Sequence, residues 1–185
     1  MNIAYALIGP PAAGKSAIAR ELGKYGVPKI ISHTTRPVRP EEKNGIDYHF
    51  VDKDTFVKTE LIEKITYAGH FYGLSKNEVM TKTESCPVTV LGIERHGFDQ
   101  LKKLLGKRLV SIFILADEAT IIDRVIELGG DPAAVQERIN YAKVCGEFDH
   151  WQFTDYIVKN TASLDDAVRQ ILAIMNLVRL PPASA

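Results

Sequence analysis

The 185-residue sequence contains only two cysteines, Cys86 and Cys145, which lie far apart and form no C-x-x-C pair. This spacing suits neither a disulfide framework nor a zinc site, so we expect two reduced structural thiols. The N-terminus lacks a basic segment followed by a long apolar stretch. The longest apolar segment, residues 109–116, is less than half as long as a membrane span. We therefore expect a cytoplasmic protein with no membrane partner.

An excess of charge of one sign is also missing, because 23 Lys and Arg residues balance 23 Asp and Glu residues. No overall electric field would recruit nucleic acid, so we expect no nucleic-acid partner. Hydrophobic residues make up 45% of the chain and charged residues 25%, which is typical of a globular domain. The length suits a single domain with its own core, and both a monomer and a homodimer fit these numbers.

The first informative motif is residues 9–16, which match the pattern G-x-x-x-x-G-K-[ST]. An apolar run at residues 3–8 precedes it and is suited to a buried strand. Residues 17–22 follow it and read as the opening of a helix. Because the motif needs this order of strand, turn and helix, we interpret it as a phosphate-binding loop rather than a simple turn.

The chemistry of such a loop depends on its backbone and on two side chains. Glycines let successive N–H groups point inward around anionic oxygens, and the helix N-terminus adds partial positive charge. Lys15 would reach the β- and γ-phosphates of a nucleotide, and the Ser16 hydroxyl would bind Mg²⁺. The loop therefore predicts a bound nucleotide and Mg²⁺. The predicted nucleotide-binding residues are Gly9, Pro10, Pro11, Ala12, Ala13, Gly14, Lys15 and Ser16.

Strand-like and helix-like segments alternate along most of the chain. The strongest buried-strand candidates are residues 87–91 and 109–115, with a helix expected at 94–105 between them. This alternation predicts an α/β, three-layer fold of the P-loop NTPase type with a parallel central sheet. Residues 32–83 break the rhythm and are expected to form an inserted lobe.

Shorter elements can also be placed. Residues 28–32, 48–51 and 156–158 are strand-like, and residues 61–72 look extended. Several helices are expected to begin at a side chain that caps their first turn, one of them through the capping-box pattern Ser75-x-x-Glu78. The expected capping residues are Ser75, Asp117, Asp131 and Ser163, and a short helix is expected at residues 52–58. The helix after Asp117 is expected to end near Leu128.

The inserted region carries two arginines, Arg36 and Arg39, in a loop stiffened by Pro37 and Pro40. Guanidinium groups spaced in this way suit a phosphate dianion, although two such arginines alone are more often surface charge. The segment Asp47-Tyr48-His49-Phe50 and then residues 69–73 follow. Together these motifs resemble the guanylate kinases, which carry T-T-R-x-x-R-x-G-E-x-x-G-x-D-Y-x-F and G-x-Y-Y-G at this distance from the phosphate-binding loop. The resemblance covers nearly the whole chain and is densest at residues 9–73.

The resemblance implies ATP-dependent phosphorylation of GMP to GDP, with ATP and GMP as small-molecule substrates. It assigns the GMP phosphate and guanine base to eight residues of the inserted region and its surroundings. These predicted substrate-binding residues are Ser32, Arg36, Arg39, Tyr48, Glu63, Tyr72, Gly73 and Glu94. Lys15, Arg124 and Arg138 are the predicted catalytic residues. The implied organisation is one domain, 1–185, with a core at 1–31 and 84–185, a GMP-binding lobe at 32–83 and a short lid at about 125–137.

The chain departs from the family pattern at four places. Leu74 replaces a hydroxyl residue that helps to hold the base, and Gly92 replaces the first Asp of a D-x-D pair, leaving Glu94 at the second position. Residues 127–130 stand where the lid usually carries the arginines of R-G-R-G, and Glu41 replaces a glycine. These changes leave nucleotide binding intact but affect catalytic efficiency and base selection.

Two other readings are compatible with parts of the pattern. Ribose 1,5-bisphosphate kinases share the fold and phosphate-binding loop, but they lack the D-Y-x-F segment and a base-reading glutamate. Guanylate-kinase-like domains of scaffold proteins bind phosphopeptides without catalysis, and they usually have a degraded phosphate-binding loop. The intact loop, Tyr48 and Glu63 favour the guanylate kinase reading over both.

Overall fold

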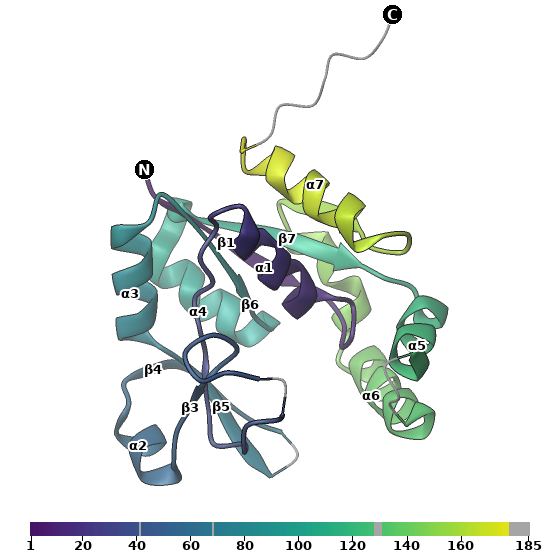
Figure 1. Ribbon diagram of the computed structural model, residues 1–185, viewed down its shortest axis with the longest axis horizontal. Coiled ribbons are helices and arrows are strands. Elements are labelled where there is room, and N and C mark those ends of the chain that lie inside the picture. The colour runs from purple at the N-terminus through teal and green to yellow at the C-terminus, as the bar shows by residue number, and fades with distance from the viewer. Residues whose placement is uncertain (41, 68, 128–130, 178–185) are drawn as a thin grey trace, which may run out of the picture. The chain divides into compact units, whose positions relative to one another are not determined.

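The computed structural model describes residues 1–40, 42–67, 69–127 and 131–177 (Figure 1). Strands and helices alternate, as the sequence predicts. The elements are, in chain order, β1 (Ile3–Ile8), α1 (Lys15–Lys24), β2 (His33–Thr34), β3 (His49–Phe50), α2 (Lys53–Lys58), β4 (Leu61–Tyr67), β5 (His70–Ser75), α3 (Lys76–Ser85), β6 (Val88–Gly92), α4 (Arg95–Leu105), the 3₁₀ segment η1 (Gly106–Arg108), β7 (Leu109–Leu115), α5 (Glu118–Glu127), α6 (Pro132–Val144), the 3₁₀ segment η2 (Glu147–Phe153), β8 (Tyr156–Lys159) and α7 (Leu164–Ile174).

The strands form two four-stranded sheets. The central sheet has the order β6-β1-β7-β8, and the second sheet has the order β3-β2-β5-β4. In the central sheet β7 and β8 pair in parallel, with Ile112 opposite Tyr156 and Leu115 opposite Lys159. The predicted α/β fold with a parallel central sheet is confirmed.

The central strands are apolar almost without interruption. In β1 every residue from Ala4 to Ile8 is buried, and in β7 the side chains of Ile112, Phe113 and Ile114 have no solvent exposure. Strands covered on both faces have such continuous apolar runs, whereas strands with one wet face alternate. The sequence pattern at residues 109–115 therefore predicted both the strand and its burial.

The chain divides into two compact units. The first unit comprises residues 1–6 and 27–110, and the second comprises residues 7–26 and 111–185. Strand β1 begins in the first unit and ends in the second. The predicted GMP-binding lobe, residues 32–83, belongs entirely to the first unit. The phosphate-binding loop belongs to the second.

In the first unit, the second sheet brings separate parts of the predicted lobe together. Strand β2 pairs in parallel with β3, where His33 lies opposite His49, and antiparallel with β5, where Thr34 lies opposite Tyr72. Strands β4 and β5 form an antiparallel pair. The extended stretch predicted at residues 61–72 is therefore two paired strands rather than one, because the chain reverses direction before His70.

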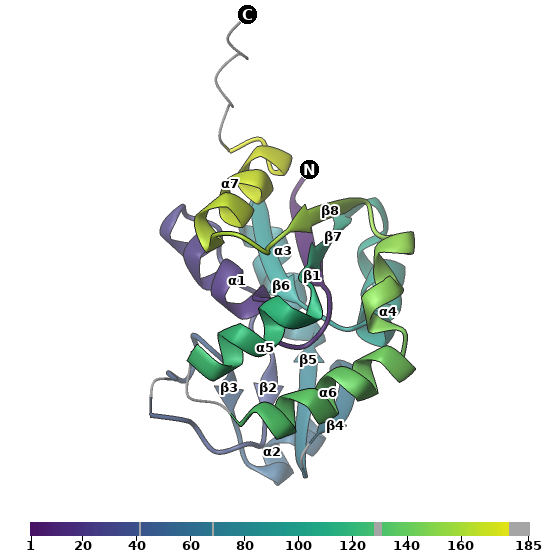
Figure 2. The same cartoon turned by 90° about the vertical axis from the view of Figure 1, so that its right-hand side faces the viewer.

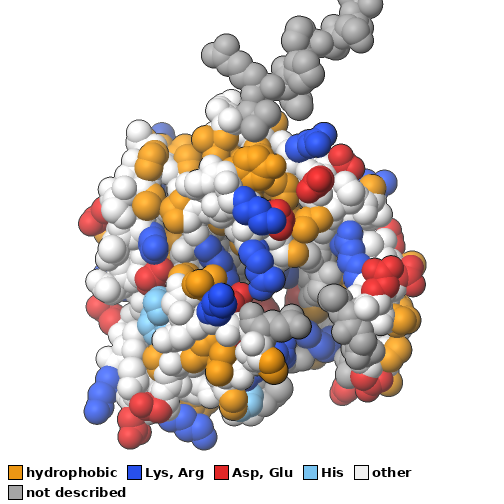
Figure 3. All heavy atoms as spheres, in the orientation of Figure 1, with side chains coloured by type: hydrophobic (Ala, Val, Ile, Leu, Met, Phe, Trp, Pro, Cys, Tyr) orange, Lys and Arg blue, Asp and Glu red, His pale blue; other side chains and the backbone are white. Residues whose placement is uncertain are grey.

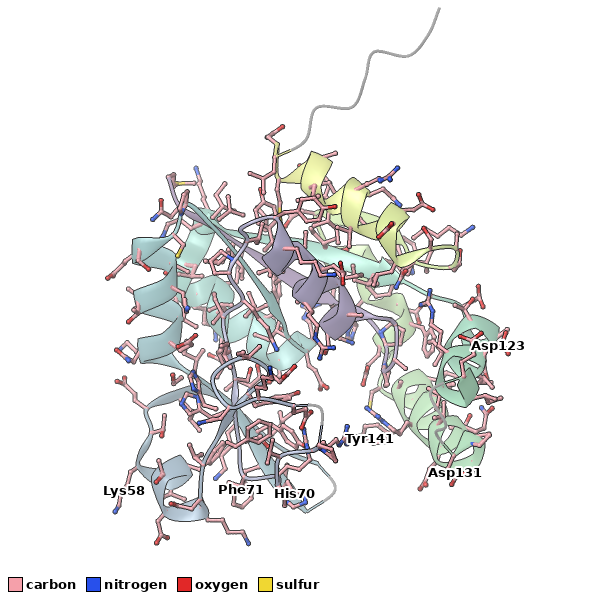
Figure 4. All side chains as sticks on the ribbon, in the orientation of Figure 1. Lys58, His70, Phe71, Asp123, Asp131 and Tyr141 are labelled. Atoms are coloured by element: carbon pink, nitrogen blue, oxygen red, sulfur yellow. The ribbon has the colours of Figure 1, made fainter. Side chains whose placement is uncertain are left out.

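The predicted helix caps are confirmed. Side-chain oxygens of the four predicted capping residues accept hydrogen bonds from backbone N–H groups in the first turn: Ser75 from Glu78, Asp117 from Thr120, Asp131 from Ala133, and Ser163 from Asp166. The structure adds a fifth cap, Asp52, which accepts from Thr55 at the start of α2. Asp131 is labelled at the start of α6 in Figure 4. The carboxylate of Glu78 does not turn back toward its own helix start, as a capping box requires. It accepts instead from Ile31 N, 3.1 Å away.

Two element boundaries differ from the prediction. Residues 28–32 contribute a single parallel bridge, between Lys29 and Val90, rather than a full strand. Backbone hydrogen bonds from Ile30 N to Val90 O, at 2.8 Å, and from Val90 N to Pro28 O, at 3.1 Å, hold this segment beside β6. Helix α5 is described to Glu127, so the end predicted near Leu128 lies outside the described residues.

In the second unit, α1 packs against α7 and α5 packs against α6 (Figures 1 and 2). Helix α1 buries Ile18, Ala19 and Leu22, and α7 buries residues one turn apart along one face, including Val168 and Ile171. Such spacing is typical of helices with one apolar face. These contacts hold α1, the helix that follows residues 9–14, in place.

On the surface, acidic and basic side chains are interspersed over the face shown in Figure 3, in keeping with the balanced composition. Within residues 1–40, 42–67, 69–127 and 131–177, no helix is both long enough and apolar enough to cross a membrane.

Candidate functional site

The phosphate-binding loop connects β1 to α1, and its two glycines are required by their surroundings. Gly9 has a φ of +150° and Gly14 a φ of +98°. A Cβ atom at Gly9 would lie 2.7 Å from the carbonyl oxygen of Ile114, and one at Gly14 would lie 2.4 Å from Nδ2 of Asn160. Both positions therefore combine an unusual backbone conformation with a close approach that only glycine permits.

Lys15 is the first residue of α1, and its ammonium group lies on the loop itself. Its Nζ donates to the carbonyl oxygens of Gly9, at 2.5 Å, and Pro10, at 2.8 Å. Ser16 follows it and is exposed in the first turn of the helix. An exposed hydroxyl beside a phosphate-binding loop fits a Mg²⁺ ion, which prefers oxygen ligands and takes most of them from phosphates and water. Among the described side chains, no three of His, Cys, Asp and Glu cluster as a metal site.

Arg124, a predicted catalytic residue on α5, lies close to the loop. Its Nη2 donates to Oδ1 of Asn160 at 3.3 Å. Its Nη1 is buried and has no hydrogen-bond partner in the described part of the chain. A Cβ atom on Gly14 would be 3.9 Å from that Nη1. An unpaired guanidinium nitrogen beside the loop is suited to a phosphate oxygen.

Asn160 is a residue that the sequence pattern did not reveal. It follows β8 and is only 1% exposed. Its Nδ2 donates to the carbonyl oxygen of Ala13 at 2.8 Å, while its Oδ1 accepts from Arg124. One amide group thus connects the loop to the arginine. The only available signal was a polar residue directly after a predicted strand, and that signal is weak.

Arg138 and Asp123 lie on the two helices of the predicted lid. Arg138 is exposed on α6, and Asp123 is exposed on α5 (Figure 4). The two helices are tied together by Glu118, which accepts from Gln136 at 3.1 Å and pairs with Lys143 at 2.5 Å. Of residues 127–130, where the family pattern would place lid arginines, residues 128–130 lie outside the described residues.

In the first unit, Arg36 is the centre of a cluster of polar and aromatic groups. Its Nη2 lies 2.7 Å from Oε1 of Glu42, and its Cζ lies 5.7 Å from the ring centroid of Tyr48 and 5.6 Å from that of Phe50. Hydrogen bonds to Glu42 and, more weakly, to Tyr72 raise the pKa of Arg36. In return, the Arg36 guanidinium holds the pKa of Glu42 below its ordinary value.

Glu42 also holds the second predicted arginine in place. Its Oε2 accepts from the backbone N–H of Arg39 at 3.0 Å, and Arg39 itself is exposed. One carboxylate therefore anchors both arginines of the loop. Glu42 matches the Glu of the family pattern, but its role as an anchor depends on a loop conformation that the pattern does not show. The neighbouring Glu41, a departure from that pattern, lies outside the described residues.

Tyr48 and Tyr72 complete this cluster. Their ring centroids are 5.9 Å apart in an edge-to-face arrangement. Burial, and then the proximity of Tyr72, raise the pKa of Tyr48, so its phenol stays protonated and can donate a hydrogen bond. The position of Tyr72 is fixed because β5 pairs with β2 beside the arginine loop.

Two threonines and Phe71 hold the arginine loop against β5. The Thr34 hydroxyl donates to the Phe71 carbonyl at 3.0 Å and accepts from Arg36 N at 3.1 Å. The Thr35 hydroxyl accepts from Phe71 N at 2.9 Å. Phe71 is labelled on β5 in Figure 4. The two threonines of the T-T-R motif are therefore structural supports of Arg36 in this unit.

Glu63 on β4 is a buried carboxylate, with 8% of its surface exposed. Its Oε2 has no hydrogen-bond partner among residues 1–40, 42–67, 69–127 and 131–177. Burial, and then the nearby charge of Glu94, raise the pKa of Glu63 from 4.5 to about 7. A buried acceptor without a partner is costly in a protein interior, and such groups are concentrated at binding sites.

The remaining predicted substrate residues of this region, Ser32, Gly73 and Glu94, belong to the same unit as Glu63. Glu94 is exposed at the cap position of α4. Leu74 is buried on β5, directly opposite Glu63 in the strand register. Gly73 allows close strand packing, because a Cβ there would lie 2.8 Å from the Glu63 carbonyl oxygen. Ser32 is half-buried, and its carbonyl accepts from His49 N at 2.9 Å.

The predicted site residues therefore form two groups. Arg36, Tyr48 and Tyr72 lie together in the first unit, and Glu63 and Glu94 interact electrostatically in the same unit. The phosphate-binding loop and Arg124 lie together in the second unit, connected through Asn160. The first group combines guanidinium, phenol and carboxylate side chains, and the second combines the glycine-bounded loop with a guanidinium nitrogen that has no hydrogen-bond partner among the described residues.

Nearly the whole chain is similar to known guanylate kinases. Over an alignment of 185 residues, the chain is 33% identical to a guanylate kinase from Nitrobacter hamburgensis, and the alignment covers 97% of this chain and 84% of that protein. It is 32% identical to a guanylate kinase from Thiobacillus denitrificans over 97% of this chain and 88% of the relative. The fold resembles the crystal structure of guanylate kinase from Anaplasma phagocytophilum, with a TM-score of 0.69 and 24% identity, covering 95% of this chain and 84% of that one. The sequence model named guanylate kinase matches residues 2–177, so the chain belongs to the guanylate kinase family.

Proposed function

We propose that this protein is an ATP-dependent guanylate kinase that converts GMP and ATP to GDP and ADP. Family membership supports this activity, and the observation that carries it is the buried carboxylate of Glu63, whose Oε2 has no hydrogen-bond partner among the described residues. It belongs to the same compact unit as the cluster of Arg36, Tyr48 and Tyr72. A site that combines a cluster of side chains able to bind phosphate with a carboxylate able to bind a base is suited to a nucleoside monophosphate rather than to a sugar phosphate.

The acceptor phosphate would be held by Arg36, Arg39, Tyr48 and Tyr72. Guanidinium groups and phenol hydroxyls are strong donors to phosphate oxygens. Glu42 already neutralises part of the charge on Arg36 through the 2.7 Å ion pair. When GMP binds, its phosphate would therefore replace Glu42 as the partner of Arg36 or share the guanidinium with it. The dianionic phosphate would then meet a guanidinium that is already oriented in the unbound protein.

The guanine base would be read by Glu63. Guanine presents N1–H and N2–H₂ as adjacent donors, and a carboxylate can accept from both. Adenine has a lone pair at N1, so the same carboxylate would face an acceptor and remain unpaired. Ser32 would lie near O6, and Glu94 would offer a second acceptor. Leu74 supplies no hydroxyl, so we expect GMP to be preferred over AMP by less than a family member with that hydroxyl achieves.

The ATP phosphates would be held by residues 9–16, with Lys15 contacting the β- and γ-phosphates. Lys15 now bonds to carbonyl oxygens of Gly9 and Pro10, so its ammonium is already beside the loop that would receive them. The Ser16 hydroxyl would hold Mg²⁺ together with phosphate oxygens and water. When bound, the ion would neutralise charge on the phosphates that are transferred.

Transfer would be a direct in-line displacement. An oxygen of the GMP phosphate forms a bond to the γ-phosphorus, the bond from that phosphorus to the β–γ bridging oxygen breaks, and ADP leaves with the electron pair. Positioning and charge neutralisation provide the rate enhancement, and no covalent enzyme intermediate is needed. Arg124 and Arg138 would neutralise the charge on the transferring group. We also propose that residues 32–83 act as the GMP-binding lobe and residues 125–137 as the lid.

A coupled assay of ADP release tests this proposal. The acceptors would be GMP, AMP, UMP, CMP and ribose 1,5-bisphosphate, each with ATP and Mg²⁺ and each repeated with EDTA. We expect turnover to be highest with GMP and to be lost with EDTA. Faster turnover of ribose 1,5-bisphosphate would favour that kinase class instead. An absence of turnover with every acceptor, combined with phosphopeptide binding, would identify a binding module.

A further inference from the structure

Gly97, on α4, lies directly against the carboxylate of Glu63. It is a buried residue in the first turns of the helix, and α4 packs against β4, which carries Glu63. A Cβ atom built on Gly97 would lie 1.3 Å from Oε2 of Glu63 and 2.3 Å from its Cδ. Non-bonded atoms cannot approach so closely. The carboxylate therefore occupies the volume that any other residue at position 97 would fill with its side chain.

The backbone does not require glycine at this position. Gly97 has none of the positive φ angles recorded for Gly9, Gly14, Gly26, Gly45 and other turn glycines. Glycine is among the least favourable residues in a helix interior, whereas alanine is the most favourable. Other buried positions of α4 are filled by large side chains, Phe98, Leu101 and Leu105. A spatial requirement, rather than a conformational one, thus accounts for glycine.

The group that fills this space is a carboxylate rather than an apolar side chain. The nearest other neighbour is Cγ1 of Ile93, at 2.9 Å from the built Cβ. A glycine that only admits an apolar neighbour serves packing. Here it admits a buried carboxylate whose Oε2 finds no hydrogen-bond partner within the described chain. Such a group contributes nothing to packing that would justify its cost.

We propose that Gly97 is a specificity-determining positioning residue, which keeps open the volume in which the Glu63 carboxylate must lie to read guanine. This inference rests on the proposed role of Glu63 in GMP recognition. A side chain at position 97 would push the carboxylate away from α4 and misalign it with the N1–H and N2–H₂ groups. Discrimination between guanine and adenine would then decrease, although residue 97 itself need not touch the base.

The test is Gly97→Ala, assayed for kcat and KM with GMP, AMP and ATP. We expect kcat/KM for GMP to fall at least about tenfold, in line with a displaced charge-assisted hydrogen bond. AMP turnover should change far less, and KM for ATP should stay the same. Gly23→Ala is the matched control, because Gly23 is a helical glycine of α1 with nothing within 4 Å of a built Cβ. An equal loss for GMP and AMP would overturn the inference.

A second pair of measurements keeps the test independent of activity. In the wild-type background Gly97→Ala should lower Tm, because the new methyl group collides with Glu63. In a Glu63→Ala background the same substitution should leave Tm unchanged or raise it, because the space is empty and alanine favours the helix. If Tm falls equally in both backgrounds, the collision is with Ile93 or the helix itself, and the inference is wrong.

A second substitution, at Glu63, should partly restore the activity that Gly97→Ala loses. Asp is one methylene shorter than Glu, so Glu63→Asp should withdraw the carboxylate from the methyl group of Ala at position 97. We expect the double variant to turn over GMP faster than Gly97→Ala alone, even though Glu63→Asp alone is harmful.

If Glu63→Ala leaves the ratio of GMP to AMP turnover unchanged, the proposed role of Glu63 fails. If that ratio falls but Gly97→Ala has no effect on it, only the inference about Gly97 fails.

Discussion

The side-chain amide of Asn160 connects Arg124 to the phosphate-binding loop. Its oxygen accepts from Nη2 of Arg124 at 3.3 Å, and its nitrogen donates to the carbonyl oxygen of Ala13 at 2.8 Å. Because the amide is almost fully buried, water cannot easily replace either bond. The loop and the arginine are therefore held by one residue that follows β8, far from both in sequence.

We expect Asn160→Ala to weaken ATP use and reduce stability. Removing the amide leaves the buried Ala13 carbonyl unpaired, which costs about 1–3 kcal/mol in the free energy of unfolding. It also releases Arg124, so kcat/KM for ATP should fall. GMP binding, measured by calorimetry without ATP, should not change. The control is Asn140→Ala on the exposed face of α6. Wild-type ATP kinetics in Asn160→Ala would show that this connection has no functional role.

Lys15→Met should reduce kcat by on the order of 10²-fold or more, as expected for the loss of one preorganised electrostatic donor. The negative charge that develops on the phosphates would then lack the positive charge of Lys15 in a site of low dielectric. GMP affinity should change little, because the residues proposed to hold GMP belong to the other unit. Lys24→Met, in the exposed last turn of the same helix, serves as the control. Full turnover by Lys15→Met would rule out the kinase mechanism.

Arg124→Ala and Arg138→Ala should each lower kcat and leave GMP binding nearly intact. The Nη1 of Arg124 is buried beside the loop and has no hydrogen-bond partner among the described residues, so the substitution removes a hydrogen-bond donor that we propose binds phosphate. The family's lid arginines are missing from the sequence at residues 127–130, so fewer other cations can substitute. Steady-state kinetics on both variants, with Arg169→Ala on the exposed face of α7 as control, would measure this. An unchanged kcat in both would exclude the assignment.

Glu63→Ala should decrease kcat/KM for GMP by one or more orders of magnitude. A charge-assisted hydrogen bond contributes about 1.5–3 kcal/mol, and losing it removes the acceptor for the guanine N–H groups. AMP turnover should fall far less, so the ratio of GMP to AMP turnover should narrow. Competition assays with both nucleotides would measure the ratio directly. If the ratio of GMP to AMP turnover does not change, another residue recognises the base.

Glu63→Gln should stabilise the protein more at pH 8 than at pH 4.5. Between pH 4.5 and about 7 the unfolded chain releases the proton of Glu63 while the folded chain retains it, because the folded pKa is raised. Stability therefore falls as pH rises through this window. The shift corresponds to at most about 3 kcal/mol, which the variant should recover above pH 7.

Urea unfolding of the wild type and of Glu63→Gln at both pH values would test this linkage. Glu60→Gln is the matched control, because the Glu60 side chain is largely exposed and lies on the surface beside Lys76. The control should show the same stability difference from the wild type at pH 4.5 and pH 8. If Glu63→Gln behaves in the same way, the carboxyl group titrates normally in the fold.

The sequence by itself determined the glycine-bounded turn between β1 and α1, the main strands and the helix starts. These features depend on interactions between residues close in the chain. Gly9 and Gly14 permit the loop's backbone angles, continuous apolar runs form buried strands, and capping oxygens reach N–H groups two or three residues later. Local chemistry of this kind leaves a pattern at fixed spacing, so it can be read without the fold.

Only the tertiary structure decided which polar groups are buried and what they touch. Four interactions join residues that are brought together only by the fold. They are the bonds of Asn160, the anchoring of Arg39 by Glu42, the contact of Glu78 with Ile31, and the volume that Gly97 leaves for Glu63. Burial raises the pKa of Glu63 because β4 packs against α4, whereas the same residue on a solvated strand would be an ordinary surface carboxylate. Desolvation depends on all surrounding atoms at once, and no spacing along the sequence encodes it.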